Sequence, residues 1–283
     1  MPDRGPILSH YEVRPLLAAR AQGAAATTGS ADLGKSTTTV ALGPDGARFA
    51  NGALVAWDAL ERIAAETSKC FVADGAGLTE IRVFSETTGW VRSLFPTGSA
   101  PTTLVAGFTM HRIQGVSPLE DTARKVKGAS PLAGRVLDTA TGLGYTAILA
   151  ARSVAEVVTV ELDPAGLELA KSNPWSDELF SARNITQRVG DVGTVIGEFA
   201  DGSFARIIHD PPTLKLAGEL YSAAFYGQLH RVLVKHGKLS HYIGDPQSQS
   251  GSRTTRGVVE RLRAAGFSRV VPDPAAYGVV AIK

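Results

Sequence analysis

Residues 135–144 read Arg-Val-Leu-Asp-Thr-Ala-Thr-Gly-Leu-Gly, a short apolar segment that runs into a turn with two glycines. The apolar pair Val136-Leu137 is typical of a buried parallel strand. Gly142 and Gly144 would let the backbone approach a ligand that any Cβ would exclude. The helix-forming sequence that starts at Tyr145 places this turn at a helix N-terminus, where free amides favour negative charge. The stretch therefore predicts a nucleoside-binding loop.

A carboxylate stands where a bound ribose would need one. A second apolar run, 157–160, ends at Glu161, about twenty residues past the loop, which is the position of the ribose-binding carboxylate in nucleotide-binding βαβ units. A third strand is expected to close at Asp191. The dinucleotide pattern would need a third glycine at position 147, where Ala147 stands, although alanine is sometimes tolerated there.

From about Ser117 to the C-terminus, the chain resembles the class I S-adenosylmethionine-dependent methyltransferases, whose first motif is similar to residues 136–144. It is similar, more closely, to a largely uncharacterised group of predicted methyltransferases. The resemblance implies S-adenosylmethionine as cofactor, with the loop under its methionine part, Glu161 on the ribose and Asp191 near the adenine amino group. The implied cofactor-binding residues are Asp138, Thr139, Gly142, Gly144, Tyr145, Glu161, Asp163 and Asp191.

The chemistry is expected at the end of the fourth strand, where 205–209 runs into Asp210-Pro211-Pro212-Thr213. Two prolines fix an extended turn and remove two amide donors, which leaves the Asp210 carboxylate and carbonyl oxygens as acceptors for an amino group. The turn resembles the Asp/Asn-Pro-Pro-aromatic motif of methyltransferases that act on amines, which implies catalytic roles for Asp210, Pro211 and Pro212. Thr213 stands where an aromatic is common, although related RNA methyltransferases also carry Asp-Pro-Pro-Thr. A rigid turn with a capping aspartate is the alternative.

A second resemblance concerns residues 217–226, which are similar to the helix after the catalytic aspartate of spermidine synthase-type aminopropyltransferases. Those enzymes use decarboxylated S-adenosylmethionine, and Asp210 would then be the general base on a polyamine. They normally have a Gly-Gly-Gly-Asp-Gly loop, which this chain lacks. We therefore expect methyl transfer to a nitrogen of an RNA base, a protein side chain or a small amine, with aminopropyl transfer as the alternative. A nucleoside-sensing module is a third possibility.

Side chains near the expected strand ends are candidates for contact with the acceptor. His111 could cover the cofactor, and His241 ends the fifth strand. His209 should point away from the proline turn by strand alternation, and Tyr221 fits a core position as well as a pocket. The predicted substrate residues are His111, Thr213, Tyr221 and His241. No histidine pair has helical ligand spacing, so we expect no metal site.

Length and patterning predict two domains and a flexible start. With 283 residues and 44% hydrophobic residues, the chain has room for a full sheet and a smaller domain. We expect a flexible segment over 1–36 in which 12–21 could form a short helix, a small strand-rich domain over 37–116 and the cofactor domain over 117–283. In the last, alternating strands and helices predict a Rossmann-like, doubly wound α/β fold with a mostly parallel seven-stranded sheet. The expected strands are 135–139, 157–161, 185–189, 205–209, 238–243, 268–271 and 277–282, and the expected helices are 145–152, 164–172, 218–234 and 254–265.

Composition indicates a cytoplasmic protein. No apolar run reaches the roughly eighteen residues of a membrane span, and the N-terminus lacks a basic start followed by an apolar signal core. The net charge of +2 is too small to require a nucleic-acid partner. With Cys70 as the single cysteine, neither an internal disulfide nor a cysteine-based zinc site can form, and we expect a structural thiol there.

Overall fold

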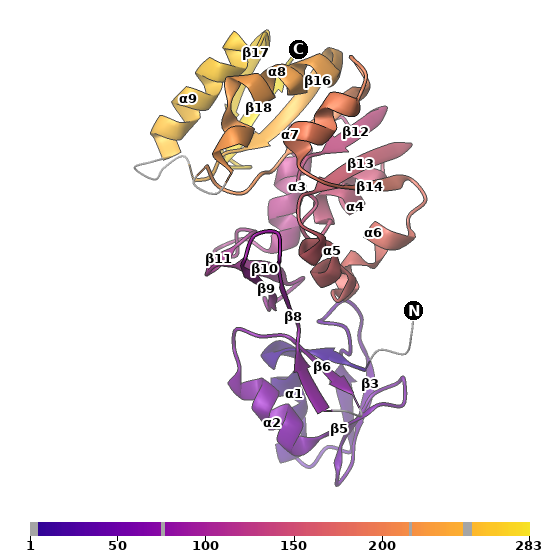
Figure 1. The fold of residues 1–283 in the computed structure, drawn as a ribbon. Helices are drawn as coiled ribbons and strands as arrows, with labels where there is room; N and C mark the ends of the chain where they lie inside the picture. Colours follow the sequence, from indigo (N-terminus) through magenta and orange to yellow (C-terminus); the bar gives the residue numbers. More distant parts are fainter. Residues whose placement is uncertain (1–4, 75–76, 215–216, 246–250) are drawn as a thin grey trace. The chain divides into compact units, whose positions relative to one another are not determined.

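In the computed structural model, the described residues are 5–74, 77–214, 217–245 and 251–283. They form two compact units, which we describe separately (Figure 1). Unit 1 comprises Met1–Leu119 together with Glu168–Asp177, and unit 2 comprises Glu120–Leu167 together with Glu178–Lys283. Residues 168–177, predicted to be part of the cofactor domain, group with unit 1 in the structure.

A seven-stranded sheet in the order β14-β13-β12-β15-β16-β18-β17 forms the centre of unit 2. All strands run parallel except β18, which pairs antiparallel with β16 and β17. The strands are β12 (Arg135–Asp138), β13 (Glu156–Glu161), β14 (Ile185–Val189), β15 (Phe204–His209), β16 (Leu233–Tyr242), β17 (Arg269–Asp273) and β18 (Gly278–Ile282). The α/β class is confirmed, with a mixed sheet. The strand order reverses between β12 and β15, and ligands bind at such a switch point, beyond the carboxyl ends of the strands.

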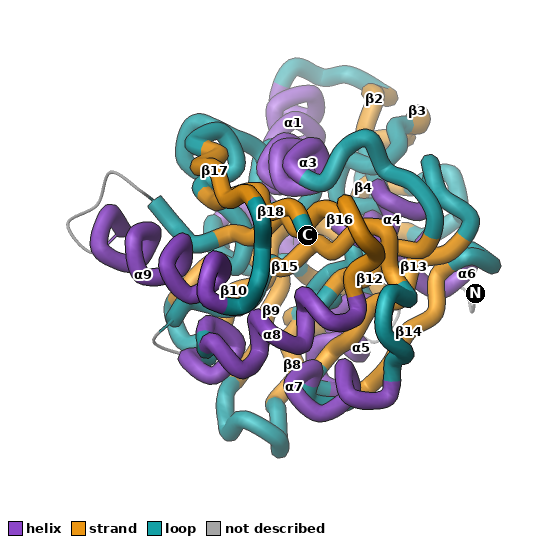
Figure 2. Tube along the Cα trace, turned by 90° about the horizontal axis from the view of Figure 1, so that it is seen from above, coloured by secondary structure: helices purple, strands orange, loops and turns teal. Residues whose placement is uncertain are grey.

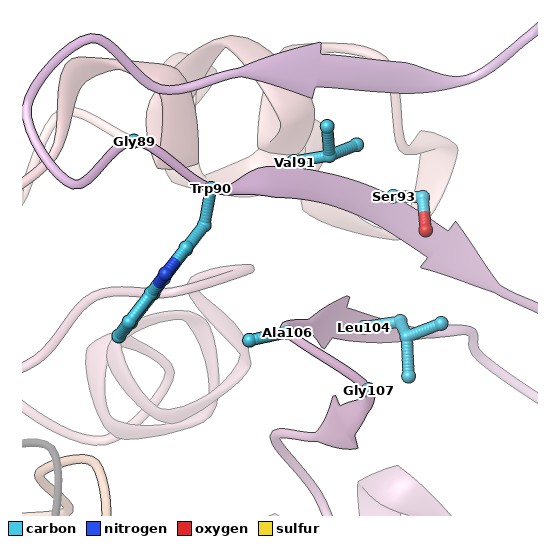
Figure 3. Close-up of a pocket in the computed structure, with 7 residues that line it drawn as sticks. All are labelled: Gly89, Trp90, Val91, Ser93, Leu104, Ala106 and Gly107. Carbon is cyan, nitrogen blue, oxygen red and sulfur yellow. The ribbon is translucent and has the colours of Figure 1, made fainter.

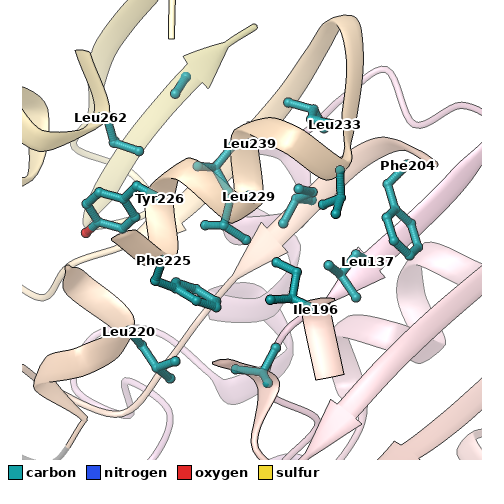
Figure 4. Close-up of a cluster of buried hydrophobic side chains, with 14 of the residues drawn as sticks. Leu137, Ile196, Phe204, Leu220, Phe225, Tyr226, Leu229, Leu233, Leu239 and Leu262 are labelled. Atoms are coloured by element: carbon teal, nitrogen blue, oxygen red, sulfur yellow. The ribbon is translucent and has the colours of Figure 1, made fainter. Parts of the chain in front are cut away.

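Helices cover both faces of this sheet. In Figure 2, α3 (Pro118–Gly128) and α4 (Tyr145–Ala151) lie on one side, and α7 (Val192–Val195), α8 (Ala223–Val232) and α9 (Gly251–Ala264) lie on the other. Figure 4 shows the second side, where Leu229 and Leu262 pack with strand residues such as Leu239. Each such fully buried side chain contributes about 1.5–3 kcal/mol to folding. Shorter or partly shared helices are α5 (Pro164–Lys171), η1 (Pro174–Ser176), α6 (Asp177–Ser181), η2 (Ile196–Glu198) and η3 (Gly218–Tyr221).

The helix predicted over 218–234 is shorter in the structure. It is divided into η3 and α8 and ends at Val232, because β16 begins at Leu233. Leu233 pairs with Phe204, and regular pairing resumes only at Lys238 with Arg206. Between them, His236 has a φ of +61°, so the strand is irregular there. A bulge of this kind has no clear periodic pattern, which explains the later strand start predicted from sequence.

Unit 1 is strand-rich. Its described strands form three antiparallel sheets, with the orders β1-β6-β7, β2-β3-β4-β5 and β11-β10-β9-β8. The strands are β1 (Ile7–Leu8), β2 (Ala26–Gly29), β3 (Thr38–Leu42), β4 (Gly46–Arg48), β5 (Leu54–Ala56), β6 (Phe71–Asp74), β7 (Gly77–Glu80), β8 (Arg82–Phe84), β9 (Val91–Phe95), β10 (Thr102–Val105) and β11 (Phe108–Thr109), and the helices are α1 (His10–Ala21) and α2 (Trp57–Ala65). No helix in the described parts of the chain is long and apolar enough to cross a membrane.

The flexibility expected over 1–36 differs from the structure of residues 5–36. Ser9 and Glu12 form a capping box at the start of α1, which satisfies amides that would otherwise lack partners. Val13 and Leu16 on this helix are completely buried in the core of unit 1. These local and packing contacts order the segment in spite of its Ala, Gly and Thr content. Residues 1–4 lie outside the described residues.

A hollow of about 330 Å³ lies over β9 and β10 in unit 1 (Figure 3). Its lining residues are Gly89, Trp90, Val91, Ser93, Leu104, Ala106 and Gly107. None of these side chains is charged or can act as a general base, so the hollow offers no group for acid–base chemistry.

Candidate active site

The loop after β12 has the left-handed backbone that favours glycine. Gly142 and Gly144 have φ values of +52° and +79°. A Cβ added to Gly142 would meet no atom within 4 Å, whereas one added to Gly144 would lie 2.6 Å from the Leu179 side chain. Gly142 therefore borders open space, as a ligand cradle requires, and Gly144 is needed for close packing. Tyr145, the first residue of α4, is buried.

Asp138 ends β12 as a completely buried carboxyl group. Its Oδ2 accepts a hydrogen bond of 2.8 Å from the Thr159 hydroxyl, and its Oδ1 has no hydrogen-bond partner in the structure. Burial raises the pKa of this carboxyl from its ordinary value to about 8. A buried oxygen without a partner is unusual in a folded protein, and a donor group of a bound ligand would satisfy it.

This raised pKa predicts a loss of stability in mild alkali. The pKa of Asp138 is higher in the folded chain than its ordinary value of 3.8. The contribution of this carboxyl to the free energy of unfolding is therefore fully present below pH 3.8 and is lost as the pH rises through about 8. Between pH 7 and pH 8, this amounts to about 1 kcal/mol. Hydrogen exchange of the β12 amides, corrected for intrinsic rates, should show this loss in the parent protein. Asp138→Asn should abolish it, and an equal loss in that variant would assign the effect elsewhere.

Acidic residues follow the next two strands. Glu161, at the end of β13, accepts hydrogen bonds from the backbone N–H groups of Gly142 at 2.8 Å and of Asp163 at 3.1 Å. It therefore ties the glycine loop to the neighbouring strand. Asp163 is buried and accepts a hydrogen bond from the backbone N–H of Ala165 in α5, while the exposed Asp191 caps α7. Asp163 thus has a local structural role that the sequence analysis did not assign.

Two buried histidines lie next to the start of the glycine loop, one in contact with Thr139 and the other in contact with the first histidine. His209 Nε2 donates to the Leu220 carbonyl at 3.0 Å, so its Nδ1 accepts from the Thr139 hydroxyl at 2.7 Å. His241 Nδ1 donates to the His209 carbonyl at 3.2 Å, so its Nε2 accepts from the Tyr226 hydroxyl at 2.9 Å. Burial lowers the pKa of His209 to about 3 and that of His241 well below its ordinary value. Both histidines lie in the core, so their hydrogen bonds support the structure, and the contact of His241 with the acceptor stays a prediction.

Asp210 lies beside a buried lysine that the sequence analysis missed. Lys125 Nζ is 2.7 Å from Asp210 Oδ2 and 2.9 Å from Asp121 Oδ2. The side chains of Lys125 and Asp121 are 3% and 0% exposed, and that of Asp210 is 18% exposed. Burial lowers the pKa of Lys125, but the carboxylates of Asp210 and Asp121 outweigh it and raise the pKa above its ordinary value. The signal in the sequence was the i,i+4 spacing of Asp121 and Lys125, which both lie on α3.

The proline turn has a second contact, with Tyr221. Pro211 is buried, whereas Pro212 and Thr213 are exposed. Tyr221 is buried, and its hydroxyl donates to the Pro212 carbonyl at 3.1 Å. Tyr221 therefore supports the turn, and the contacts of Tyr221 and of the exposed Thr213 with substrate stay predictions.

His111 belongs to unit 1. Its Nδ1 lies 2.9 Å from the Thr102 hydroxyl, which also accepts a hydrogen bond from the His111 backbone N–H at 3.1 Å. Its contact with substrate stays a prediction. Among the residues that the structure describes, no group of three or more His, Cys, Asp and Glu side chains could hold a metal ion.

Comparison with known proteins gives one extended and several partial likenesses. No protein-family model matches the chain. It is 43% identical to uncharacterized protein MJ1233 of Methanocaldococcus jannaschii over 240 residues, which are 84% of this chain and 81% of that protein. It is 38% identical to the ribosomal protein L11 methyltransferase of Desulfitobacterium hafniense over 76 residues, 27% of this chain and 24% of that protein. The crystal structure of spermidine synthase from Thermotoga maritima is similar with a TM-score of 0.56 and 16% identity, covering 71% of this chain and 72% of that one. The resemblance to methyltransferases is thereby confirmed over about a quarter of the chain, and the resemblance to spermidine synthases is confirmed for the fold.

Proposed function

Because this chain belongs to the family of uncharacterized protein MJ1233 of Methanocaldococcus jannaschii, whose name states no activity, we propose a function from the site: S-adenosylmethionine-dependent methyl transfer to a nitrogen. One observation carries the proposal. β12 and β15 pair in parallel, with Asp138 opposite Ile208, so the glycine loop and the Asp210 turn leave the sheet at the same edge. A donor on the loop and an acceptor at Asp210 would therefore meet there.

The residues of the loop fit S-adenosylmethionine. Gly142 borders open space, Asp138 offers a buried oxygen without a partner, and Glu161 ends the strand where a ribose would bind. Asp191 at the end of β14 would lie toward the adenine. When bound, the cofactor supplies an activated methyl group. The other predicted cofactor-binding residues would act by shaping the site: Thr139, Gly144, Tyr145 and Asp163.

The task of the protein is then alignment. Asp210 would accept a hydrogen bond from the acceptor nitrogen and direct its lone pair toward the methyl group. Lys125 and Tyr221 hold the Asp210-Pro211-Pro212 turn in place on two sides. In the best-oriented intramolecular reactions, alignment lowers the activation barrier by about 7–11 kcal/mol. The few residues of this site are therefore sufficient for catalysis by alignment.

Aminopropyl transfer is the second candidate, and the sequence of 217–226 favours it. The two activities differ in the donor, because decarboxylated S-adenosylmethionine lacks the amino-acid carboxylate. We expect calorimetric titration to show at least about tenfold tighter binding of S-adenosylmethionine than of the decarboxylated donor, the loss typical of one charge-assisted contact. Tighter binding of the decarboxylated donor, or formation of spermidine from putrescine, would establish aminopropyl transfer instead.

A further inference from the structure

The buried lysine beside Asp210 is fixed by its surroundings. Lys125 Nζ contacts Asp121 on the preceding turn of α3 and Asp210 at the end of β15. It also lies 4.2 Å from the centre of the Tyr242 ring, and the Lys125 carbonyl accepts a hydrogen bond of 2.8 Å from the Ser240 hydroxyl. The ammonium group is thus held in one position by α3, β15 and β16.

This arrangement decides which charge an acceptor meets. Asp121 is completely buried, and Lys125 stands between it and Asp210 by contacting both. An acceptor at the turn would therefore face Asp210 paired with an ammonium group at 2.7 Å. At that distance the pair acts as a dipole whose two charges largely cancel.

We propose that Lys125 is the specificity-determining residue of the site: it offsets the charge of Asp210, so that the acceptor is an uncharged nitrogen, as in an aromatic amine or amide, and cationic alkylamines are rejected. This inference rests on the proposed function. An uncharged nitrogen has its lone pair available, so the N–C bond forms as the S–C bond breaks, sulfur keeps the electron pair, and the N–H proton leaves to solvent. An alkylammonium has no free lone pair, and its positive charge gains little from a carboxylate whose charge Lys125 already offsets.

The test replaces Lys125 together with its buried partner Asp121. Lys125→Met combined with Asp121→Leu leaves the net charge of the chain unchanged and leaves Asp210 without its ammonium. The probe is putrescine, a dication, titrated calorimetrically into the full chain saturated with S-adenosylhomocysteine. We expect the double variant to bind putrescine at least about tenfold more tightly than the parent, and Asp210→Asn in the same background to remove that gain.

Two further variants control for folding and for general charge effects. Arg135→Met with Glu156→Leu removes a half-buried ion pair of 2.8 Å at the start of β12 and β13, and this variant should bind putrescine like the parent. Lys125→Gln with Asp121→Asn keeps polar contacts and replaces the apolar pair should that protein not fold.

The outcomes separate this inference from the proposed function. A parent protein that binds no S-adenosylhomocysteine refutes the proposed function. A parent that binds S-adenosylhomocysteine but also binds putrescine as tightly as the double variant overturns the role of Lys125 alone. The role is equally overturned if neither protein binds putrescine, or if the gain survives Asp210→Asn.

Discussion

Gly142→Asn is expected to weaken the binding of S-adenosylhomocysteine by about 100-fold, or about 2.7 kcal/mol, in a calorimetric titration. A Cβ at Gly142 would meet no protein atom within 4 Å, so a side chain there enters the space assigned to the ligand. Asparagine tolerates the φ of +52° better than other side chains, which keeps the cost to folding small.

A second glycine provides the matched control for backbone strain. Gly202, in the turn before β15, has a φ of +62°, and the atom nearest to its added Cβ is 3.9 Å away. Gly202→Asn should lower the melting temperature as much as Gly142→Asn while leaving binding unchanged. Parent-like affinity in Gly142→Asn would place the cofactor somewhere else. Gly144 is the poorer site for this test, because a side chain there would collide with Leu179.

The sheet of unit 2 could be predicted because its signals are local. Apolar runs of strand length alternate with helical segments, and the last two predicted strands follow each other without a helix, which is typical of an antiparallel pair. The burial of α1 in unit 1 could not be predicted in this way, since it depends on Val13 and Leu16 meeting a core made by distant residues. The grouping of 168–177 with unit 1 has the same cause: Trp175 Nε1 donates to the Leu33 carbonyl, 142 positions earlier in the chain.

The residues of the candidate site also differ in whether local sequence or long-range packing determines their positions. Gly142 and the Asp210 turn are set by backbone geometry within a few residues, so the sequence indicates them. The burial of Tyr221 and His241 is decided by how α8 and α9 cover the sheet, and alternation along one strand does not contain that information. The partnership of Lys125 with Asp210 joins residues 85 positions apart on a helix and a strand. It became visible only in three dimensions.

Asp210→Ala is expected to lower methyl transfer by about 100-fold or more, the usual range for a group that acts on the reacting nitrogen. The affinity for S-adenosylhomocysteine should stay within about twofold, since Asp210 follows the fourth strand of the unit and the glycine loop follows the first. Methyl-labelled S-adenosylmethionine, incubated with separated RNA, protein and small-molecule fractions of a cell extract, supplies the measurement even while the acceptor is unidentified. Normal methyl transfer by Asp210→Ala would contradict a catalytic role for Asp210, and the proline turn would then have only a structural role.

Asp210→Asn distinguishes the two ways in which the carboxylate could act. The amide keeps an oxygen that accepts a hydrogen bond but cannot take a proton, and Lys125 still has Asp121 as its partner at 2.9 Å. If Asp210 orients an uncharged nitrogen, as its pairing with Lys125 favours, this variant should keep a substantial part of the parental rate, well above that of Asp210→Ala. A rate as low as that of Asp210→Ala would mean that proton removal by the carboxylate is essential, and the lysine would then have to release Asp210 during turnover.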